Sequence, residues 1–287
     1  MSYSVQGRTV LVTGAARGIG AGVARALAAR GAKLSLVGLE PELLAQLAAE
    51  LGPDAAWFEA DVTDRAALDA AVAGTVERFG GIDVVIANAG VAPVGTVATL
   101  PREAFVKTLD VNLTGVYDTI HAALPHVVER KGYILPIASG AAVMHLPMMA
   151  PYAASKAAVE AFADCLRVEL RPKGTAVGCA YFLFIDTDMV RQADRHPATQ
   201  RSKVTIGTAP LSAAVDAIVD GIERRARVVY APRALGPMMV LRGIINPLAN
   251  RLAPRRRDVR DAIRLAEEQP QAPGSGPMAP DAAAGGG

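Results

Sequence analysis

The sequence predicts an α/β fold in which helices cover both faces of a doubly wound parallel sheet of about seven strands. Short β-branched or aliphatic runs alternate with longer segments whose apolar residues recur every three or four positions, which is typical of strand–helix–strand units. Right-handed crossovers between such strands wind the sheet in both directions. The chain has 287 residues, of which 51% are hydrophobic, so a single globular domain with a well-covered core is expected.

Each expected strand is a short apolar run, and each expected helix fills the interval that follows one. The strands are Thr9–Thr13, Lys33–Val37, Ala55–Glu59, Val84–Ala87, Gly132–Ile137, Thr175–Ala180 and Val228–Ala231. The helices are Gly18–Arg30, Glu42–Leu51, Asp64–Phe79, Pro101–Val128, Tyr152–Arg171 and Ser212–Arg225.

Composition excludes several classes of protein. With 30 basic and 28 acidic residues the net charge is +2, which gives no reason to expect a nucleic-acid partner. Two cysteines, Cys165 and Cys179, cannot form a disulfide framework, so reduced thiols and a cytoplasmic location are expected. We expect neither a signal peptide nor a transmembrane helix, because no charged N-terminal region precedes an apolar stretch and no apolar run reaches 18 residues. The four histidines lack metal-ligand spacing, and no metal is expected.

A glycine-rich run, Thr13-Gly14-Ala15-Ala16-Arg17-Gly18-Ile19-Gly20, links the first strand to the first helix. Backbone amides and the positive end of a helix attract an anion there, and glycines let the backbone approach a pyrophosphate closely. The alternative is an ordinary turn with several glycines. Because the run lies between a strand and a helix, we interpret it as a dinucleotide-binding loop.

Tyr152 and Lys156 stand four residues apart, so they share one helical face with Cβ atoms roughly 5–6 Å apart. A nearby ammonium favours the phenolate, so the pKa of Tyr152 is expected to fall from its usual value near ~10. A phenol tuned in this way can act as a general acid and base.

Other polar residues follow the strands, and each has an ordinary explanation. Asn88-Ala89-Gly90 follows the fourth strand and could line a ligand or form a turn, while Asp61-Val62 after the third could meet a ligand or begin a helix. Ser139 ends the fifth strand and could hold a carbonyl oxygen or make a turn. Asn112 lies inside an expected helix, where a solvent-facing side chain is the plain expectation.

In their order and spacing these motifs resemble the short-chain dehydrogenase/reductase family over approximately residues 7–232. The resemblance implies a Rossmann-type fold, a proton exchanged between Tyr152 and the substrate oxygen, and a Lys156 that binds the nicotinamide ribose. Ser139 would orient the substrate carbonyl, and Asn112 would hold a water in a proton relay to Lys156. The cofactor-binding residues would be Gly14, Arg17, Gly18, Ile19, Gly20, Asp61, Val62, Asn88, Ala89, Gly90, Tyr152, Lys156 and Thr187.

Two departures from the family pattern bear on the cofactor. Tyr181-Phe182 stands where the family usually has Pro-Gly before its lid, although Thr187-Asp188-Met189 does match. At the end of the second strand Gly38 and Leu39 replace the usual Asp of NAD enzymes and Arg of NADP enzymes. Arg17 could pair with a 2′-phosphate, while Glu40 could repel it or accept a ribose hydroxyl. NADP(H) is favoured slightly, and NAD(H) stays open.

The chain is expected to divide into three parts. Residues 1–233 form the catalytic domain, in which 181–210 is too long for a simple connection and is interpreted as a lid. Residues 234–267 form a C-terminal helical extension, which Pro237, Pro247 and Pro254 would divide into short helices. Residues 268–287, rich in Pro, Gly and Ala, are expected to be disordered.

The expected activity is the interconversion of a hydrophobic secondary alcohol and a ketone. Apolar residues follow Ser139 and the sixth strand and could wall a substrate pocket or belong to the core; they are Met144, Leu146, Met148, Met149, Phe182, Leu183, Phe184 and Ile185. His145 among them is interpreted as a pocket-wall or surface residue. A 3-oxoacyl thioester reductase and a non-catalytic dinucleotide sensor remain alternatives.

Two expectations concern partners. The resemblance implies a homodimer or homotetramer. The apolar, arginine-bearing segment 235–265 permits a peripheral membrane contact, although a solvated basic helix is favoured.

Overall fold

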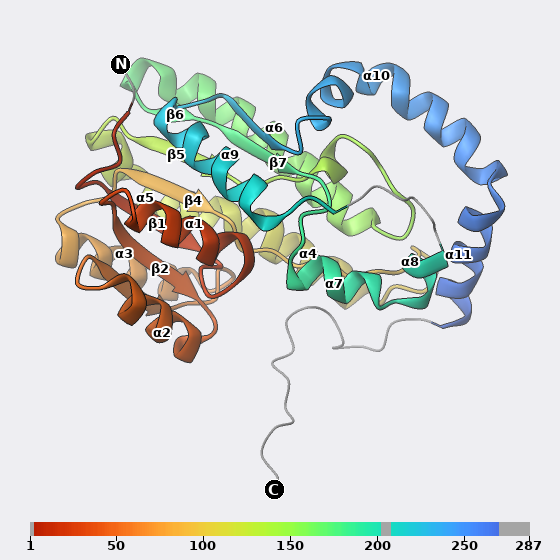
Figure 1. Cartoon of the computed structure of the whole chain (residues 1–287), viewed down its shortest axis with the longest axis horizontal. Coiled ribbons are helices and arrows are strands. Elements are labelled where there is room, and N and C mark those ends of the chain that lie inside the picture. Colours follow the sequence, from red (N-terminus) through yellow and green to blue (C-terminus); the bar gives the residue numbers. More distant parts are fainter. Residues whose placement is uncertain (1–2, 202–207, 270–287) are drawn as a thin grey trace, which may run out of the picture.

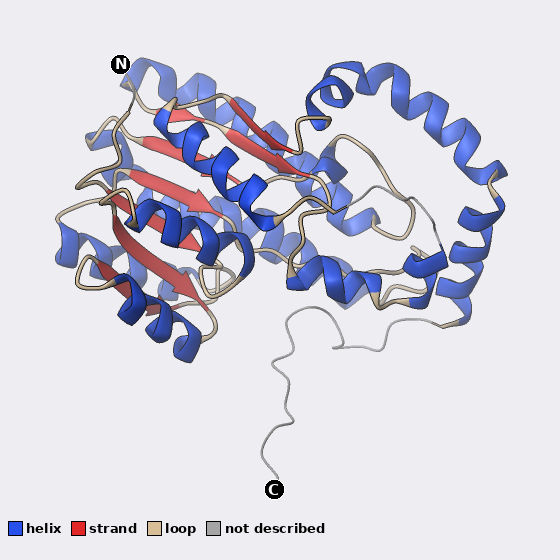
Figure 2. Ribbon diagram, viewed as in Figure 1, coloured by secondary structure: helices blue, strands red, loops and turns tan. Residues whose placement is uncertain are grey.

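The structure is a computed structural model in which residues 3–201 and 208–269 are described. Its main sheet is parallel and has six strands in the order β3-β2-β1-β4-β5-β6 (Figure 2). These are β1 (Thr9–Thr13), β2 (Lys33–Gly38), β3 (Ala55–Glu59), β4 (Val84–Ala87), β5 (Tyr133–Pro136) and β6 (Ala176–Val177). The order reverses between β1 and β4, and a crevice for ligands opens at the carboxyl ends of strands at such a point. The expected doubly wound fold is confirmed.

The sixth expected strand is divided in two, so six strands form the main sheet and two more pair beside it. A Cβ atom at Gly178 would lie 2.1 Å from the Tyr133 hydroxyl, which donates a hydrogen bond of 2.8 Å to the Ala226 carbonyl. Beyond this close contact, β7 (Cys179–Phe182) pairs with β8 (Val228–Ala231) in a separate parallel two-stranded sheet. An isolated bridge between Ile137 and Ala180 joins this pair to the main sheet.

Three helices pack on each face of the sheet (Figure 1). One face carries α1 (Gly18–Ala28), α2 (Pro41–Leu51) and α9 (Leu211–Glu223), and the other carries α3 (Arg65–Phe79), α5 (Gly115–Glu129) and α6 (Ala150–Leu170). Successive strand residues point to opposite faces, so Val10 and Val12 of β1 enter one core while Leu11 enters the other. All three side chains are buried, which explains why the strands read as continuous apolar runs.

The single helix expected over residues 101–128 is interrupted. α4 (Arg102–Leu109) leads into a π-helical turn at Asp110–Thr114, and α5 continues from Gly115. Such turns hold one extra residue and occur frequently at functional sites. Here the turn carries Asn112.

The C-terminal extension also differs from expectation. α10 (Leu235–Leu252) is one continuous helix. Pro237 lies in the first turn of α10, where backbone N–H groups have no acceptor within the helix, so its missing N–H costs no hydrogen bond. Pro247 lies in the interior and removes one backbone hydrogen bond there. A 3₁₀ turn at Ala253–Arg255 connects it to α11 (Arg257–Glu268), which packs against α8 (Pro197–Arg201) and closes an arch (Figure 1). α7 (Asp188–Asp194) precedes α8 in the segment expected to be a lid. The tail expected to be disordered was 268–287; Glu268 is the last residue of α11, and residues from 270 onward lie outside the described chain.

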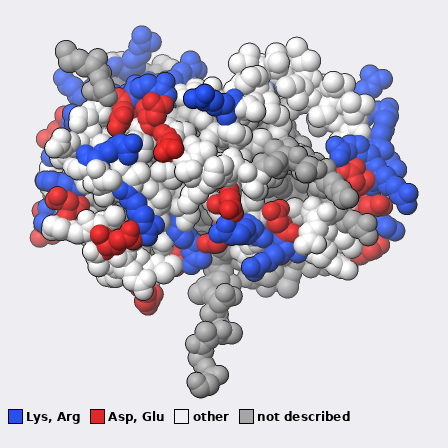
Figure 3. Space-filling view, in the orientation of Figure 1, with Lys and Arg blue, Asp and Glu red and all other residues white. Residues whose placement is uncertain are grey.

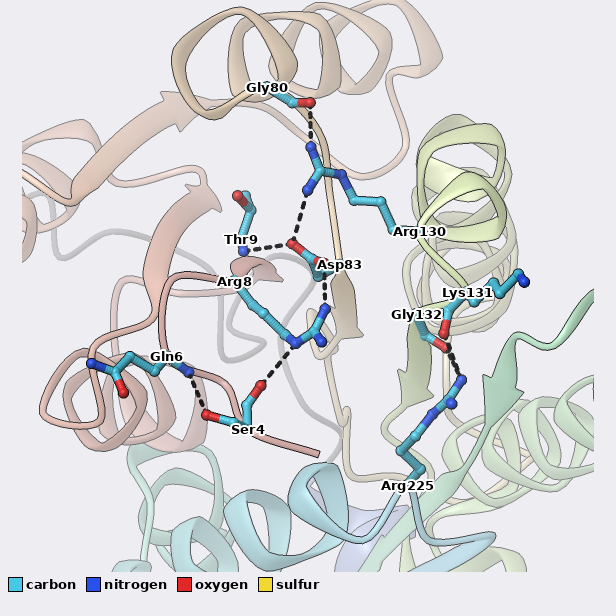
Figure 4. A network of polar contacts seen from close by, with 10 residues as sticks. All are labelled: Ser4, Gln6, Arg8, Thr9, Gly80, Asp83, Arg130, Lys131, Gly132 and Arg225. Carbon is cyan, nitrogen blue, oxygen red and sulfur yellow. Dashed lines mark hydrogen bonds and ion pairs between the residues drawn. The ribbon is translucent and has the colours of Figure 1, made fainter. Parts of the chain in front are cut away.

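At the amino ends of the strands a polar network surrounds the buried carboxylate of Asp83 (Figure 4). Asp83 accepts hydrogen bonds from the Arg8 guanidinium at 2.9 Å and from the Thr9 amide at 3.0 Å, and Arg130 lies 3.6 Å away. Arg130 also donates to the Gly80 carbonyl at 2.5 Å. The network ties β1, β4 and the end of α5 together at the edge of the sheet opposite the crevice.

Candidate active site

The glycine-rich loop between β1 and α1 forms the first wall of the site. Gly14 has φ +62° and Gly18 has φ +55°, a region that disfavours side chains. A Cβ at Gly20 would lie 2.2 Å from the Gly14 carbonyl oxygen, so this turn accepts only glycine there. α1 has no acidic residue in its first turn, and no side chain in the described chain caps it. The amides at its N-terminus are therefore available to an anion.

Asn88, which follows β4, forms hydrogen bonds that hold this loop in place. Its side-chain amide donates to the Thr13 carbonyl at 3.0 Å and to the Gly14 carbonyl at 3.2 Å. The Thr13 hydroxyl accepts hydrogen bonds from the backbone N–H groups of Asn88, at 3.1 Å, and Ala89, at 3.3 Å. The expected ligand-lining residues thus also hold the two strand ends on either side of the crevice together.

Asn112 reaches the crevice from the π-helical turn and is fully buried, contrary to the plain expectation of a solvent-facing side chain. Its amide nitrogen donates to the Val91 carbonyl at 2.9 Å and to the Ser155 hydroxyl at 3.1 Å, and its oxygen accepts from the Val91 amide at 2.8 Å. A Cβ at Gly90 would lie 3.2 Å from that oxygen and 3.5 Å from the Lys156 Nζ atom. Asn112 and Lys156 therefore converge on Gly90.

Lys156 is buried on α6, with a side chain directed to the sheet. Its ammonium donates to the Ile137 carbonyl at 2.8 Å. Burial lowers the pKa of Lys156 to about 8. A lysine with such a pKa can lose or gain a proton near working pH, as a relay requires.

Tyr152 stands in the first turn of α6, and the Lys156 Nζ atom lies 5.8 Å from its ring centroid. Burial raises the pKa of Tyr152, and a hydrogen bond with the Ser139 hydroxyl lowers it by a smaller amount. This is a correction, because we expected Lys156 to lower the pKa of Tyr152 and desolvation raises it instead. The phenol is accordingly in its proton-donating form at neutral pH.

Ser139 follows β5 and is buried beside Tyr152. Its hydroxyl donates to the Phe182 carbonyl at 3.3 Å and accepts from the Ala141 amide at 3.1 Å, at the start of a 3₁₀ turn. A Cβ at Gly140 would lie 2.7 Å from the side chain of Leu183, so the residue that follows β7 packs closely against this turn. The turn and β7 together fix the position of the serine.

Thr187 closes the site over the glycine-rich loop. Its methyl carbon lies 3.8 Å from the position of a Cβ at Gly18, and its hydroxyl accepts from the Val190 amide at 3.4 Å as the N-cap of α7. The segment beyond Tyr181-Phe182 thus returns to the loop without the usual Pro-Gly. Residues 202–207 of the expected lid lie outside the described chain.

The remaining cofactor-binding candidates lie after β3 and in the glycine-rich loop. Asp61 accepts from the amide and hydroxyl of Thr63, at 2.9 and 2.8 Å, and Asp64 rather than Asp61 caps α3. Val62 is buried against Gly115. Arg17, exposed at the loop, forms an ion pair with Glu40.

The apolar residues expected to wall the pocket divide between the core and partly buried positions. Phe182 and Ile185 are buried in one core and Leu183 in the other, so these three side chains belong to the interior. Met148 is buried with Val94 and α11 residues, whereas His145 is exposed. Four residues of the set are partly buried: Met144, Leu146, Met149 and Phe184. Within the described residues no three His, Cys, Asp or Glu side chains could together hold a metal ion.

Comparison with known proteins identifies the family. The short chain dehydrogenase family matches residues 8–198, which is more than half of the chain. The chain belongs to this family. It is an oxidoreductase of the short-chain dehydrogenase/reductase type, acting on CH–OH groups with a nicotinamide dinucleotide.

Several relatives illustrate the likeness. The chain is 38% identical over 170 residues to 2,3-dihydro-2,3-dihydroxybenzoate dehydrogenase from Bacillus subtilis, covering 58% of this chain and 65% of that enzyme. A short chain dehydrogenase/reductase from Burkholderia phymatum, solved in complex with NAD, superposes with a TM-score of 0.75 at 24% identity, covering 84% and 94% of the two chains. The 3-ketoacyl-(acyl-carrier-protein) reductase from Brucella melitensis, complexed with NADH, gives a TM-score of 0.70 at 25% identity, covering 79% and 98%.

Two features of this short-chain dehydrogenase were missed by sequence reasoning. Ser155 links Asn112 to Tyr152, because its hydroxyl donates to the Tyr152 carbonyl at 2.8 Å while accepting from Asn112. Its position directly before Lys156 was the only available signal.

The second feature is the contact between α6 and α10. Glu160 of α6 accepts two hydrogen bonds from Arg242 of α10, at 2.8 and 2.9 Å, and burial raises the pKa of neighbouring Tyr181. No sequence pattern relates these distant positions.

Proposed function

We propose that the protein interconverts a hydrophobic secondary alcohol and the corresponding ketone, with Tyr152 as the general acid and base. The observation that carries the proposal is the meeting of the Tyr152 and Ser139 hydroxyls at the crevice edge, beside the buried pair of Lys156 and Asn112. A bound nicotinamide dinucleotide supplies or accepts the hydride. The chain's own residues supply position and the proton.

In the reducing direction, Ser139 holds the carbonyl oxygen and the Tyr152 phenol donates its proton to that oxygen as the carbon receives hydride. Lys156 returns a proton to the phenolate, and Asn112 holds the water through which Lys156 regains its own proton. In the oxidising direction Tyr152 must first lose its proton, and its raised pKa opposes this step at neutral pH. Reduction should therefore persist at lower pH, while alcohol oxidation should accelerate as pH rises.

The substitution Tyr152→Phe tests the assignment. It removes the only proposed proton donor to the substrate and leaves the dinucleotide contacts of the glycine-rich loop in place. We expect turnover to fall below a few per cent of the wild-type rate, while the Kd for the preferred dinucleotide, titrated by fluorescence, changes little. A variant that retains substantial turnover would show that another group transfers the proton.

The loop and the end of β2 bear on the choice of dinucleotide, and we propose a small preference for NADP(H) over NAD(H). A Cβ at Gly38 would meet only ordinary contacts, the nearest being Leu44 at 3.6 Å, so the lack of a side chain there is not imposed by packing. Arg17 is exposed and can turn to a 2′-phosphate, a group that suits guanidinium geometry. Its partner Glu40 competes with that phosphate.

Two substitutions separate these contributions. Glu40→Gln removes the competing carboxylate and should tighten NADPH binding several-fold, with little change for NADH, because only NADPH carries the 2′-phosphate. Arg17→Ala should weaken NADPH binding and leave NADH binding nearly unchanged. Fluorescence titration of both dinucleotides measures each effect. Equal responses of NADH and NADPH in both variants would exclude the proposed 2′-phosphate contact.

A second candidate substrate class is a 3-oxoacyl thioester. The likeness to the Brucella melitensis reductase and the arginines of the C-terminal extension favour it, because cationic residues attract an acidic carrier. Comparing turnover of a 3-oxoacyl pantetheine thioester with that of simple ketones decides between the two. Tight dinucleotide binding without turnover of either class would instead indicate a sensor, although such a protein would not need the Tyr152 and Ser139 pair.

We also propose a homodimer or homotetramer built on the outer faces of α5 and α6. Tyr117 of α5 is 46% exposed and Val168 of α6 is 74% exposed, so both helices present an apolar side chain that a second copy could cover. Light scattering after size-exclusion chromatography should give a multiple of 29.8 kDa. A monomer at high concentration would contradict this assembly.

A further inference from the structure

α10 is held to the rest of the molecule along one side only. Leu235 is buried at its start, Arg242 pairs with Glu160 of α6, and Asn246 donates to the Val143 carbonyl at 2.8 Å. These three residues recur at helical spacing and so share one face of the helix. That face is the anchored side.

The opposite side of α10 carries an apolar stripe exposed to solvent. Val240, Ile244 and Leu248 follow one another at intervals of four residues, and they are 83%, 71% and 55% exposed. Leu241 and Leu252 beside them are 48% and 49% exposed. We call Val240, Ile244 and Leu248 the outer stripe. Contiguous exposed apolar surface of this kind on a helix indicates an interaction site.

The charge around the outer stripe is of one sign. Between Arg224 and Arg257 the sequence has nine arginines and no acidic residue. Arg251 lies seven residues after Ile244 and therefore two turns along the same face. Within the described chain neither Arg251 nor Arg255 forms an ion pair. Figure 3 shows the uncharged surface over α10 with Lys and Arg side chains gathered near its C-terminal end.

We propose that the outer stripe docks onto the surface of an anionic lipid bilayer. A helix with apolar residues on its outward face and arginines at its end lies in the interface, with the apolar side chains among the acyl chains and the guanidinium groups at the lipid phosphates. The anchored side explains why the helix presents this face outward. No described helix is both long and apolar enough to span a bilayer, so the contact is peripheral.

A second copy of the chain fits this surface less well. In a symmetric contact between two α10 helices, the arginines of one copy would meet a helix that carries no acidic residue. An anionic lipid surface supplies the missing negative charge. The proposal concerns binding and does not depend on the proposed reaction.

Flotation of the full chain with vesicles tests the proposal. One set consists of phosphatidylcholine and phosphatidylglycerol in equal amounts, and the other of phosphatidylcholine alone. We expect several-fold more protein bound to the anionic vesicles, with binding reduced by high salt. Equal binding to both vesicle types, or none to either, overturns the proposal.

Matched variants assign the contact to α10. Val240→Ser/Ile244→Ser/Leu248→Ser should abolish flotation, and Arg251→Gln/Arg255→Gln should weaken it several-fold while leaving the stripe intact. The control Leu43→Ser/Trp57→Ser changes exposed apolar residues at the far end of the molecule and should bind like the wild type. Thermal unfolding and dinucleotide titration check that each variant is folded.

Light scattering tests the competing explanation, in which the outer stripe contacts a second copy of the chain. If the triple variant lowers the oligomeric state and the wild type ignores lipid, the outer stripe is a contact between copies and the membrane proposal is wrong. If the triple variant floats as well as the wild type, another surface binds the lipid, which also overturns it.

Discussion

At the scale of single residues, the buried charge of Lys156 links stability to pH. The fall of its pKa from 10.5 to about 8 corresponds to about 3 kcal/mol against the charged form in the fold. Between pH ~8 and pH ~10.5, Lys156 is protonated in more of the unfolded chains than of the native molecules. Stability should therefore rise with pH across this window, because the penalty is fully present below pH ~8 and is relieved above ~10.5.

The substitution Lys156→Met measures this effect. Met has a similar volume and no charge, so the variant should unfold at higher denaturant than the wild type at neutral pH, while losing most turnover. The stability difference between the two proteins should shrink as pH rises toward the unfolded pKa, which urea titration at several pH values can follow. A variant that is less stable at neutral pH would mean that the hydrogen bond to Ile137 outweighs the cost of burial.

At the scale of elements, Gly178 lies at the break between β6 and β7. An added methyl group would lie 2.1 Å from the Tyr133 hydroxyl and 2.5 Å from the Ala226 carbonyl, so Gly178→Ala should cost about 1–3 kcal/mol of stability. Gly243→Ala on α10 meets nothing within 4 Å and should instead stabilise by about 0.5–1 kcal/mol. Chemical denaturation of both variants checks the opposite signs.

At the scale of the whole molecule, the two ends of the sheet have different roles: the amino ends of the strands stabilise the fold, and the carboxyl ends form the crevice. Asp83 and Asn88 flank β4, the first within a stabilising network and the second beside the crevice. Asp83→Asn leaves Arg8 and Arg130 without a charged partner and should cost about 3 kcal/mol, with dinucleotide affinity unchanged. Asp69→Asn, which breaks the exposed pair with Arg65, should cost less than about 0.5 kcal/mol. A large loss of affinity in Asp83→Asn would show that the two ends are coupled.

The sequence by itself determined the order of strands and helices, the doubly wound sheet and the family, because these depend on local periodicity and on short motifs. The loop from Gly14 to Gly20 and the step from Tyr152 to Lys156 are of this kind, since neighbours along the chain set their geometry. Thr187, matched by its motif alone, lies over that loop.

Only the tertiary structure decided which distant residues meet and which are desolvated. It brought Asn112 and Lys156 to Gly90, placed Phe182 and Ile185 in the core, and raised the pKa of Tyr152. It also kept α10 continuous through Pro247 and turned the outer stripe to solvent. Burial and electrostatic environment arise from packing between elements, and a periodic pattern gives the face of a helix without saying what covers it.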